Sequence, residues 1–244
     1  MSTAFYSHPE CRLHDMGAGH PECPQRLDAI GDHLRATGLD IALDFHDAPV
    51  ATLDQLSRAH ASGYVAEVLD HMQRVRDEGE HYAVDPDTTV GTGTLQAALR
   101  SAGAAVAATD EVLSGRASNA FCAVRPPGHH ATRDQAMGFC FFNNIAVAAR
   151  HALDVHGLQR VAIVDFDVHH GNGTEDIIAG DERALRRQLG QRLLQRLQVL
   201  HRVGFRSPPA RAGAPRRCAP ARSGCSRLPG RRRCVPAHGV RPPP

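Results

Sequence analysis

The feature that most constrains the fold is a short apolar run that ends in acids and histidines. Residues 161–164 read Val-Ala-Ile-Val and lead into Asp165, Asp167, His169 and His170. Because the run is mostly β-branched and has no polar alternation, it predicts a central strand of a parallel sheet that is covered on both faces. Strands of this kind carry active sites at their carboxyl ends. We therefore expect an α/β protein with its site at this end of the strand.

The two acids and the first histidine are spaced so that they can converge. Side chains alternate across a strand, so Asp165, Asp167 and His169 are expected on one side while the extended conformation lasts. Two carboxylates at the end of an apolar strand need cations or hydrogen bonds to offset their desolvation. A mixed carboxylate and imidazole set suits zinc, with iron and manganese as alternatives. A bare Asp-x-Asp is more often an ion-paired strand end, but the adjoining histidines and glycine turn favour a metal site.

A second strand end supplies paired imidazoles. Residues 121–124 predict a strand, and they are followed by Arg-Pro-Pro-Gly and then by His129 and His130. A neutral histidine can accept a proton from water, and a protonated one can donate to a leaving group, so one pair could serve both halves of a hydrolysis. A lone His-His is usually a solvated loop pair. Here the rigid turn and the downstream acids favour a catalytic pair.

Three ordered segments resemble the zinc-dependent histone deacetylase family, which includes bacterial deacetylase-like and acetylpolyamine amidohydrolases. They are RPPGHHA at residues 125–131, MGFCFFNN at residues 137–144 and VDFDVHHGNGTE at residues 164–175. The resemblance covers roughly residues 5–182, the front part of such a domain. It implies an α/β fold of the arginase/deacetylase type, a parallel sheet with helices on both faces, here incomplete at its C-terminal side.

The resemblance also implies a metal site and a substrate channel. Asp167 and His169 correspond to zinc ligands, and Gly138 and Phe139 to the wall of a narrow channel that admits an acetylated amine. In many members a structural potassium ion is bound nearby, by Asp165 and by the backbone carbonyl groups of Asp167 and His169.

The histidine pair acquires roles in the same way. By resemblance His129 and His130 lie beside the catalytic water, with Asp165 orienting His129 and Asn172 behind His130. The asparagine in His-Gly-Asn-Gly resembles the class II and bacterial branches. The Gly-His-Pro-Glu-x-Pro-x-Arg segment implies a place near the floor of the site for Arg26, for which an ordinary surface role stays equally open.

The implied activity is removal of acetyl from an acetylated amine, either acetyl-lysine in a protein or an acetylpolyamine. A pseudoenzyme or binding protein that keeps the pocket without turnover is the main alternative. An arginase-like ureohydrolase is disfavoured, because His-His-Gly-Asn-Gly replaces the carboxylate-rich two-manganese pattern. In the family a third ligand, an aspartate, and a carbonyl-polarising tyrosine or histidine lie further downstream. Since no acid follows Glu182 and no Tyr follows Tyr82, we expect this chain to be weakly active or inactive.

The composition changes completely after Glu182. Residues 1–182 contain 12 Arg and 26 Asp plus Glu, whereas residues 183–244 contain 16 Arg and no acid. Nine of the 16 prolines also lie in the second segment, which therefore cannot continue a packed α/β domain. We predict a deacetylase-like domain over residues 1–182 and a non-homologous Arg/Pro-rich, disordered tail over residues 183–244. A shifted reading frame that begins around residues 182–187 would explain the change.

Other interpretations of the tail are weaker. Leucines within residues 184–201 allow a basic amphipathic helix for an acidic partner. A zinc site formed by Cys218, Cys225, Cys234 and His238 is disfavoured, because these residues lack the closely spaced ligand pairs of known zinc modules. Nucleic-acid binding by the arginines would be sensitive to salt and blind to sequence.

The remaining features indicate an ordinary reduced, membrane-free protein. No apolar run reaches membrane-spanning length and residues 1–16 lack a secretory signal, so we expect a cytoplasmic location. The seven cysteines lack the spacing of a disulfide framework and predict reduced thiols, mostly packing residues.

Local patterns predict further strands and helices. Residues 3–7 predict a strand, a helix is expected after Pro24, and residues 52–55 form a capping-box pattern. Further helices are expected with Ser62 as a cap, over residues 94–115, from Asn143 or Asn144 to Gly157, and with Thr174 as a cap. The strands before and after the 143–157 helix predict a βαβ crossover.

Overall fold

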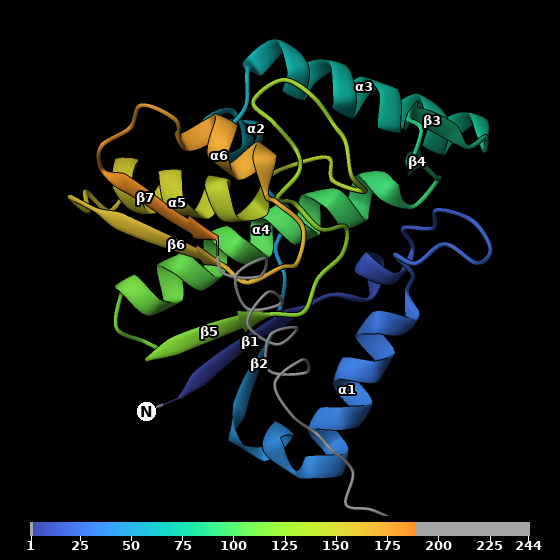
Figure 1. The fold of residues 1–244 in the computed structure, drawn as a ribbon. Helices are drawn as coiled ribbons and strands as arrows, with labels where there is room; N and C mark the ends of the chain where they lie inside the picture. The colour runs from blue at the N-terminus through green and yellow to red at the C-terminus, as the bar shows by residue number, and fades with distance from the viewer. Residues whose placement is uncertain (1, 189–244) are drawn as a thin grey trace, which may run out of the picture. The chain divides into compact units, whose positions relative to one another are not determined.

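The computed structural model describes residues 2–188. All described residues belong to one structural unit. Six α-helices, two short 3-10 helices and seven strands form this part of the chain (Figure 1). The strands are β1 Thr3–Ser7, β2 Leu43–Asp47, β3 Tyr82–Asp85, β4 Thr88–Val90, β5 Asn119–Cys122, β6 Val161–Asp165 and β7 Ala184–Gln188. The helices are η1 Pro9–Arg12, α1 Gln25–Thr37, η2 Leu39–Ala42, α2 Leu53–Ser57, α3 Ser62–Glu78, α4 Thr94–Leu113, α5 Asn144–Asp154 and α6 Asn172–Ile178.

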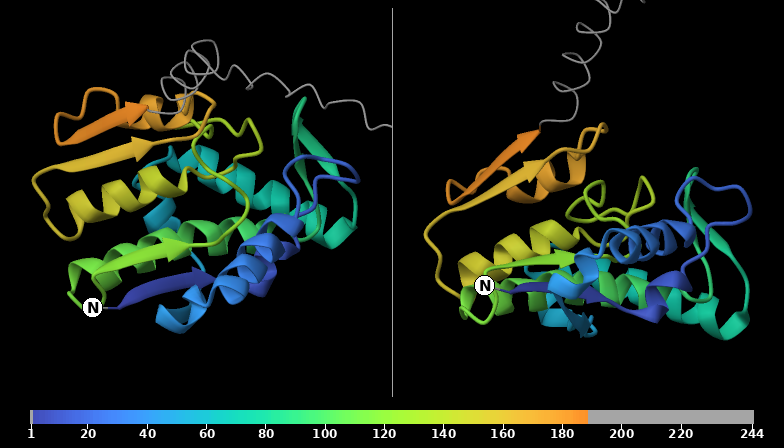
Figure 2. Two further views of the ribbon diagram at one scale, coloured as in Figure 1. Left: turned by 60° about the horizontal axis from the view of Figure 1, so that its bottom comes forward. Right: turned by 90° about the horizontal axis from the view of Figure 1, so that it is seen from below.

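The described strands form two parallel sheets and one hairpin. The first sheet has the order β2-β1-β5, the second pairs β6 with β7, and β3 and β4 form an antiparallel hairpin. The two views of Figure 2 show β6 and β7 lying apart from the first sheet, with α4 and α5 alongside (Figure 2). The α/β prediction is confirmed, and no backbone ladder joins the two sheets within residues 2–188.

The strands before and after α5, β5 and β6, were expected to be neighbours in one sheet, but they do not pair with each other. Among the described strands β5 pairs with β1, and β6 pairs with β7. Parallel ladders with one intervening α-helix do form elsewhere, between β1 and β2, where two 3-10 helices also intervene, and between β6 and β7. The prediction was wrong about adjacency, because the order strand, helix, strand does not specify whether other strands lie between its two strands.

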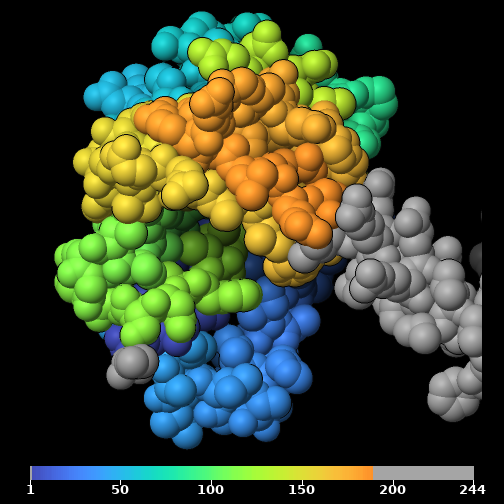
Figure 3. Space-filling model, turned by 60° about the vertical axis from the view of Figure 1, so that its left-hand side comes forward, coloured from blue at the N-terminus to red at the C-terminus, as the bar shows by residue number. Residues whose placement is uncertain are grey.

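The coverage expected for β6 was also wrong for the described residues. Ile163 is buried, but Val164 is 55% exposed and Phe166, just beyond the strand, is 80% exposed. One face of β6 therefore packs on the core while the other stays open. Figure 3 shows β6 and β7, in yellow to orange, above the green segment that contains β5 (Figure 3).

The alanine-rich helix α4 connects the parts of the core. Its small side chains Ala104 and Ala108 pack against Ala4 and Tyr6 of β1. A Cβ atom at Gly103 would lie 2.0 Å from the carbonyl oxygen of Pro49, so only glycine permits the segment after β2 to pass this close. The larger core cluster gathers α3, α4 and α5 around side chains such as Phe141 and Phe142.

Helix starts agree with the sequence prediction to within a few residues. The capping box of Thr52 and Gln55 is present, and the Asn143 side chain accepts a hydrogen bond from the first turn of α5. Ser62 is the first residue of α3 rather than its cap. Thr174 lies inside α6, where its buried hydroxyl group bonds to Asn143 instead of capping the helix. The apolar face of α1, Leu27, Ile30 and Leu34, is only half-buried.

The chain continues in regular structure beyond the expected boundary at Glu182. Residues 184–188 form strand β7 in a parallel ladder with β6. The amphipathic helix considered for residues 184–201 is therefore wrong at its start, because the backbone of these residues pairs with an open strand edge. The rest of that helix and the tail cysteines lie outside the described residues. Within the described part no helix has the length and apolar character needed to cross a membrane.

Two buried histidines make stability depend on pH. His60 donates to the carbonyl oxygen of Thr132 and accepts from the backbone N–H of Asn143, while His14 contacts the Thr94 hydroxyl group. Burial lowers the pKa of His60 to about 4 and that of His14 to about 3. Between these pKa values and the usual 6.5 for histidine, the unfolded chain binds protons at these two residues and the folded chain does not. The free energy of unfolding therefore decreases as the pH falls.

We expect the free energy of unfolding to decline from about pH 6.5 towards pH 4, with His60 contributing roughly 3 kcal/mol of the loss at about 1.4 kcal/mol per pKa unit. Urea unfolding at pH 7.5, 6.5, 5.5 and 4.5 measures this slope. His60→Gln keeps polar atoms without a titrating ring, and it should flatten the curve. An identical slope in that variant would contradict the assignment.

Candidate active site

The loop after β6 is organised by its own carboxylates. Strand β6 ends at Asp165, whose Oδ1 accepts the backbone N–H of Asp167 at 3.1 Å. The Oδ1 atom of Asp167 in turn accepts the backbone N–H of His169 at 2.8 Å. The predicted grouping of these residues is thus present, but strand alternation is not its cause. Two successive side-chain to backbone turns produce it, because aspartate competes well for nearby N–H groups.

The two strand ends meet at the histidine pair. The Nδ1 atom of His129 lies 3.1 Å from Oδ2 of Asp165, and Nδ1 of His130 lies 2.7 Å from Oδ1 of Asn172. The two imidazole rings are adjacent, with centroids 4.1 Å apart. The contacts predicted for Asp165 and Asn172 are therefore formed, across 36 and 42 residues of sequence.

These contacts fix the tautomers of the pair. A carboxylate can only accept, so Asp165 holds the proton of His129 on Nδ1. The amide group of Asn172 donates to the sulfur of Met137, which directs its oxygen to His130 and holds that proton on Nδ1 as well. The Nε2 atom of each ring is therefore left to face another partner. Burial lowers the pKa of His130, so this ring is neutral and able to accept a proton at pH 7.

Asp167 and His169 face one another beside the pair. Oδ1 of Asp167 lies 3.1 Å from Nδ1 of His169, and the rings of His130 and His169 are 6.1 Å apart. Partial burial acts to raise the pKa of Asp167, but the hydrogen bond from the His169 backbone N–H and the neighbouring histidines outweigh it and lower the pKa. A charged carboxylate and an imidazole nitrogen are thus presented together on a partly exposed loop.

Gly138 lies against the ring of His130, and Phe139 follows it in the chain. A Cβ atom at Gly138 would lie 2.6 Å from Cδ2 of His130, and the backbone φ angle there is +56°. Phe139 adopts a φ angle of 68°, unusual for a residue with a side chain, while its N–H donates to Oγ1 of Thr88. Its ring meets His20 edge-on at 4.7 Å.

A groove runs beside the histidine pair and the acidic loop. Its lining mixes site residues with exposed apolar side chains of β6 and α5. The residues are Pro127, Gly128, His129, Asn144, Ile145, Ile163, Val164, Asp165, Phe166, Asp167 and Val168.

The sequence model of the histone deacetylase domain matches residues 20–188, more than half of the chain. The chain belongs to the histone deacetylase family. The crystal structure of the HDA15 HD domain is similar with a TM-score of 0.70 and 35% identity, over 77% of this chain and 52% of that one. The fold is therefore of the arginase/deacetylase type, as the sequence predicted.

Named relatives agree with this family. A histone deacetylase-like amidohydrolase of Pseudomonas aeruginosa is 45% identical over 160 residues, which are 66% of this chain and 41% of that protein. The polyamine deacetylase HDAC10 of Rattus norvegicus is 39% identical over 182 residues, 74% of this chain and 30% of that protein. The chain thus spans less than half the length of these two deacetylase relatives.

Asp167 and His169 are residue types that bind zinc, but they are fewer than the protein ligands of a usual catalytic zinc site. Zinc bonds of about 2.0–2.2 Å to oxygen and nitrogen could bridge the 3.1 Å between Asp167 and His169. Catalytic zinc usually takes three protein ligands. Within residues 2–188, no further His, Cys, Asp or Glu joins these two as a compact ligand group.

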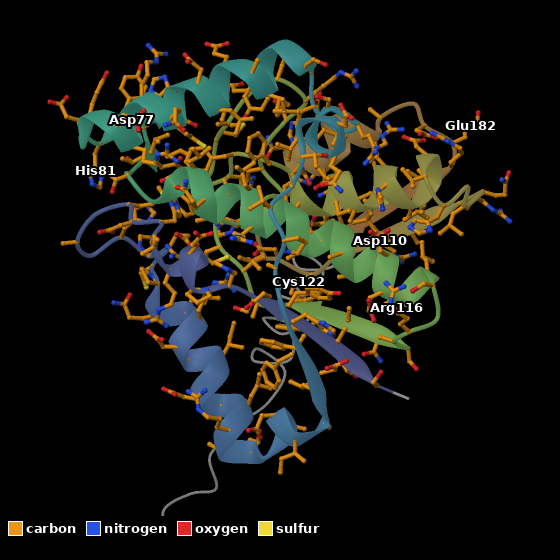
Figure 4. The ribbon with its side chains drawn as sticks, turned by 180° about the vertical axis from the view of Figure 1, so that it is seen from behind. Asp77, His81, Asp110, Arg116, Cys122 and Glu182 are labelled. Atoms are coloured by element: carbon orange, nitrogen blue, oxygen red, sulfur yellow. The ribbon has the colours of Figure 1, made fainter. Side chains whose placement is uncertain are left out.

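A second cluster among the described residues contains residue types that bind metals, but its side chains are engaged in hydrogen bonds with one another and with Arg58. Ligand atoms of Asp110, His151 and His156 lie within 4.8 Å of one another, and Figure 4 labels Asp110 on α4 (Figure 4). The guanidinium group of Arg58 lies 3.2 Å from Nδ1 of His151, which must therefore accept. The His151 proton then sits on Nε2 and is donated to Asp110 at 2.6 Å. With both ring nitrogens of His151 engaged, by Arg58 and by Asp110, the cluster serves as a hydrogen-bonded link between α4 and α5.

Sequence reasoning missed the support beneath the histidine pair. The wholly buried Arg125 makes two hydrogen bonds to Glu22, at 2.6 and 2.5 Å, and a third to the carbonyl oxygen of Cys11. This ion pair ties the N-terminal segment to the turn that carries His129. Its only sequence signal was the presence of both residues in the matched motifs. Arg26 instead donates to the carbonyl oxygen of Val124, so its suggested role at the floor stays a prediction.

Proposed function

We propose that this domain is a zinc-dependent hydrolase that removes acetyl from an acetylated amine. The observation that carries the proposal is the pairing of His129 with Asp165 and of His130 with Asn172 beside Asp167 and His169. Zinc, held by Asp167 and His169, would supply a Lewis acid that polarises the acetyl carbonyl group and makes water more acidic.

The chain's own residues would move the protons. Neutral His130 offers Nε2 to take a proton from the attacking water, and the pair can return a proton to the leaving amine. Asp165 can balance a positive charge on His129, whereas Asn172 orients His130 without adding charge. Gly138 and Phe139 would confine the substrate against His130.

Acetyl-lysine in a protein and an acetylpolyamine are both retained as substrates in this proposal. Relatives named as histone deacetylase-like and as polyamine deacetylase support both. We propose further that the 244-residue chain lacks turnover, since it supplies two zinc ligands among residues 2–188 and no acid after Glu182. A binding protein without turnover is therefore the second candidate. The alternative that the tail binds nucleic acid involves mainly residues beyond 188, which the structure does not describe.

The ligand assignment predicts that metal content and activity respond differently to two neighbouring acids. In a chain that keeps residues 1–188, including β7, and has its reading frame restored after Gln188, here called the restored chain, Asp167→Ala should lose zinc and turnover together. Asp165→Ala should keep most zinc but lose about 10- to 100-fold in turnover, because it removes only the partner that orients His129. Elemental analysis and deacetylation of an acetyl-lysine peptide measure both quantities. Undiminished zinc in both Asp167→Ala and His169→Ala would place the metal elsewhere.

A further inference from the structure

The carbonyl groups of the two proposed zinc ligands converge on one side chain of β7. Nε2 of Gln188 donates to the backbone oxygen of Asp167 at 2.8 Å and to that of His169 at 3.0 Å. Its Oε1 atom faces two donors, the backbone N–H of Gly171 at 3.4 Å and the guanidinium group of Arg186. Donors and acceptors thus match at both ends of the amide group, which determines its orientation.

The second β7 side chain supplies positive charge. The guanidinium group of Arg186 is largely buried and lies 4.0 Å from Oδ2 of Asp165 and 3.7 Å from Oε2 of Glu175. It also lies 3.5 Å from Nδ1 of His170. Two neighbouring carboxylates, Asp165 and Asp167, need a compensating cation when they are partly removed from water, and Arg186 provides one.

These contacts do not fit the potassium ion that the family resemblance implied. Such an ion would need the carbonyl oxygens of Asp167 and His169 and the carboxylate of Asp165 as ligands. Potassium is bound by oxygen atoms that replace its hydration shell. Here a nitrogen donor faces both carbonyl groups, and a cationic side chain already approaches the carboxylate.

We propose that Gln188 and Arg186 together replace a monovalent cation in this chain. The amide group supplies directed donors to the two carbonyl oxygens, and the guanidinium group supplies the charge. The loop that carries Asp167 and His169 is thereby held by β7 and does not depend on potassium. Gln188 is a positioning residue, since its contacts with the proposed ligands Asp167 and His169 are to their backbone oxygen atoms. The order of this loop is a property of the 244-residue chain whether or not the chain turns over substrate.

The test is hydrogen exchange of the loop peptide that spans residues 165–172, measured on the 244-residue chain in KCl and in choline chloride at equal ionic strength. Exchange in the wild-type chain should be the same in both salts. Gln188→Glu places a carboxylate against the two carbonyl oxygens, so in choline chloride it should speed exchange roughly tenfold or more. Added KCl should then restore slow exchange with saturation, because the variant offers a cation only oxygen atoms.

Two further variants keep the result interpretable. Gln188→Ala removes the donor without adding charge and should also exchange faster than wild type, which covers the case that Gln188→Glu fails to fold. Arg187→Ala alters the exposed neighbour on the same strand and should behave as wild type. Saturable slowing of wild-type exchange by KCl, but not by choline chloride, would overturn the proposal. Wild-type exchange in both Gln188 variants would overturn it as well.

Discussion

Replacing either His129 or His130 by Ala in the restored chain should reduce turnover by about 10²- to 10⁴-fold, the usual contribution of a positioned acid or base. Both rings are held by Nδ1 contacts, to Asp165 and Asn172, and both keep Nε2 for the reaction. Neither ring is an assigned zinc ligand, so bound zinc should remain near the level of the unsubstituted chain. The loss should therefore appear in kcat more than in metal content.

The matched control uses a histidine of the other cluster. His156 lies in a comparable histidine pair, with rings 5.2 Å apart, and bonds to Asp110 outside the proposed site. His156→Ala should leave turnover within about twofold, since the contacts of this residue, with Asp110 and His151, lie outside the proposed site. Full turnover in both His129→Ala and His130→Ala would reject the proton-transfer role.

Local chemistry explains what the sequence predicted correctly. The Thr52 capping box, the Asn143 cap and the β-branched residues of β6 involve neighbours within a few positions, so their pattern reports their structure. The contacts of the histidine pair span longer distances along the chain. They were predictable only because the family resemblance implied partners for His129 and His130.

Other features depend on contacts that no local pattern reveals. Glu22 and Arg125 are separated by 103 residues, and either alone is indistinguishable from an exposed charge. The turns that gather Asp167 and His169 arise from side-chain competition for backbone donors, where strand alternation predicted a continued strand. Gln188 lies in a segment interpreted as tail, and its role depends on the pairing of β7 with β6.

The second large effect concerns the 244-residue chain, which we expect to show turnover at least about 10³-fold below that of the restored chain. Removing a full set of catalytic groups typically costs this much or more. In the proposed site Asp167 and His169 would provide two of the three protein ligands that catalytic zinc usually requires, and no Asp or Glu follows Glu182. The family's carbonyl-polarising tyrosine also has no counterpart after Tyr82.

The open face of β6 predicts poor solubility for the same chain. Val164, Phe166 and Val168 are 55%, 80% and 45% exposed and lie along the groove beside the site. Among the described strands, β6 also keeps one edge unpaired. Exposed apolar edges of this kind favour association between chains. The soluble yield of the restored chain should therefore be several-fold higher, provided that the added segment covers this face.

The most direct measurement compares bound zinc and deacetylation in the 244-residue chain and the restored chain, purified side by side. Acetyl-lysine peptide and an acetylpolyamine serve as substrates. We predict about one zinc per restored chain, with measurable release of acetate, and substoichiometric zinc without turnover in the 244-residue chain. Full activity and stoichiometric zinc in the 244-residue chain would contradict this account, because a third ligand would then have to come from residues 189–244.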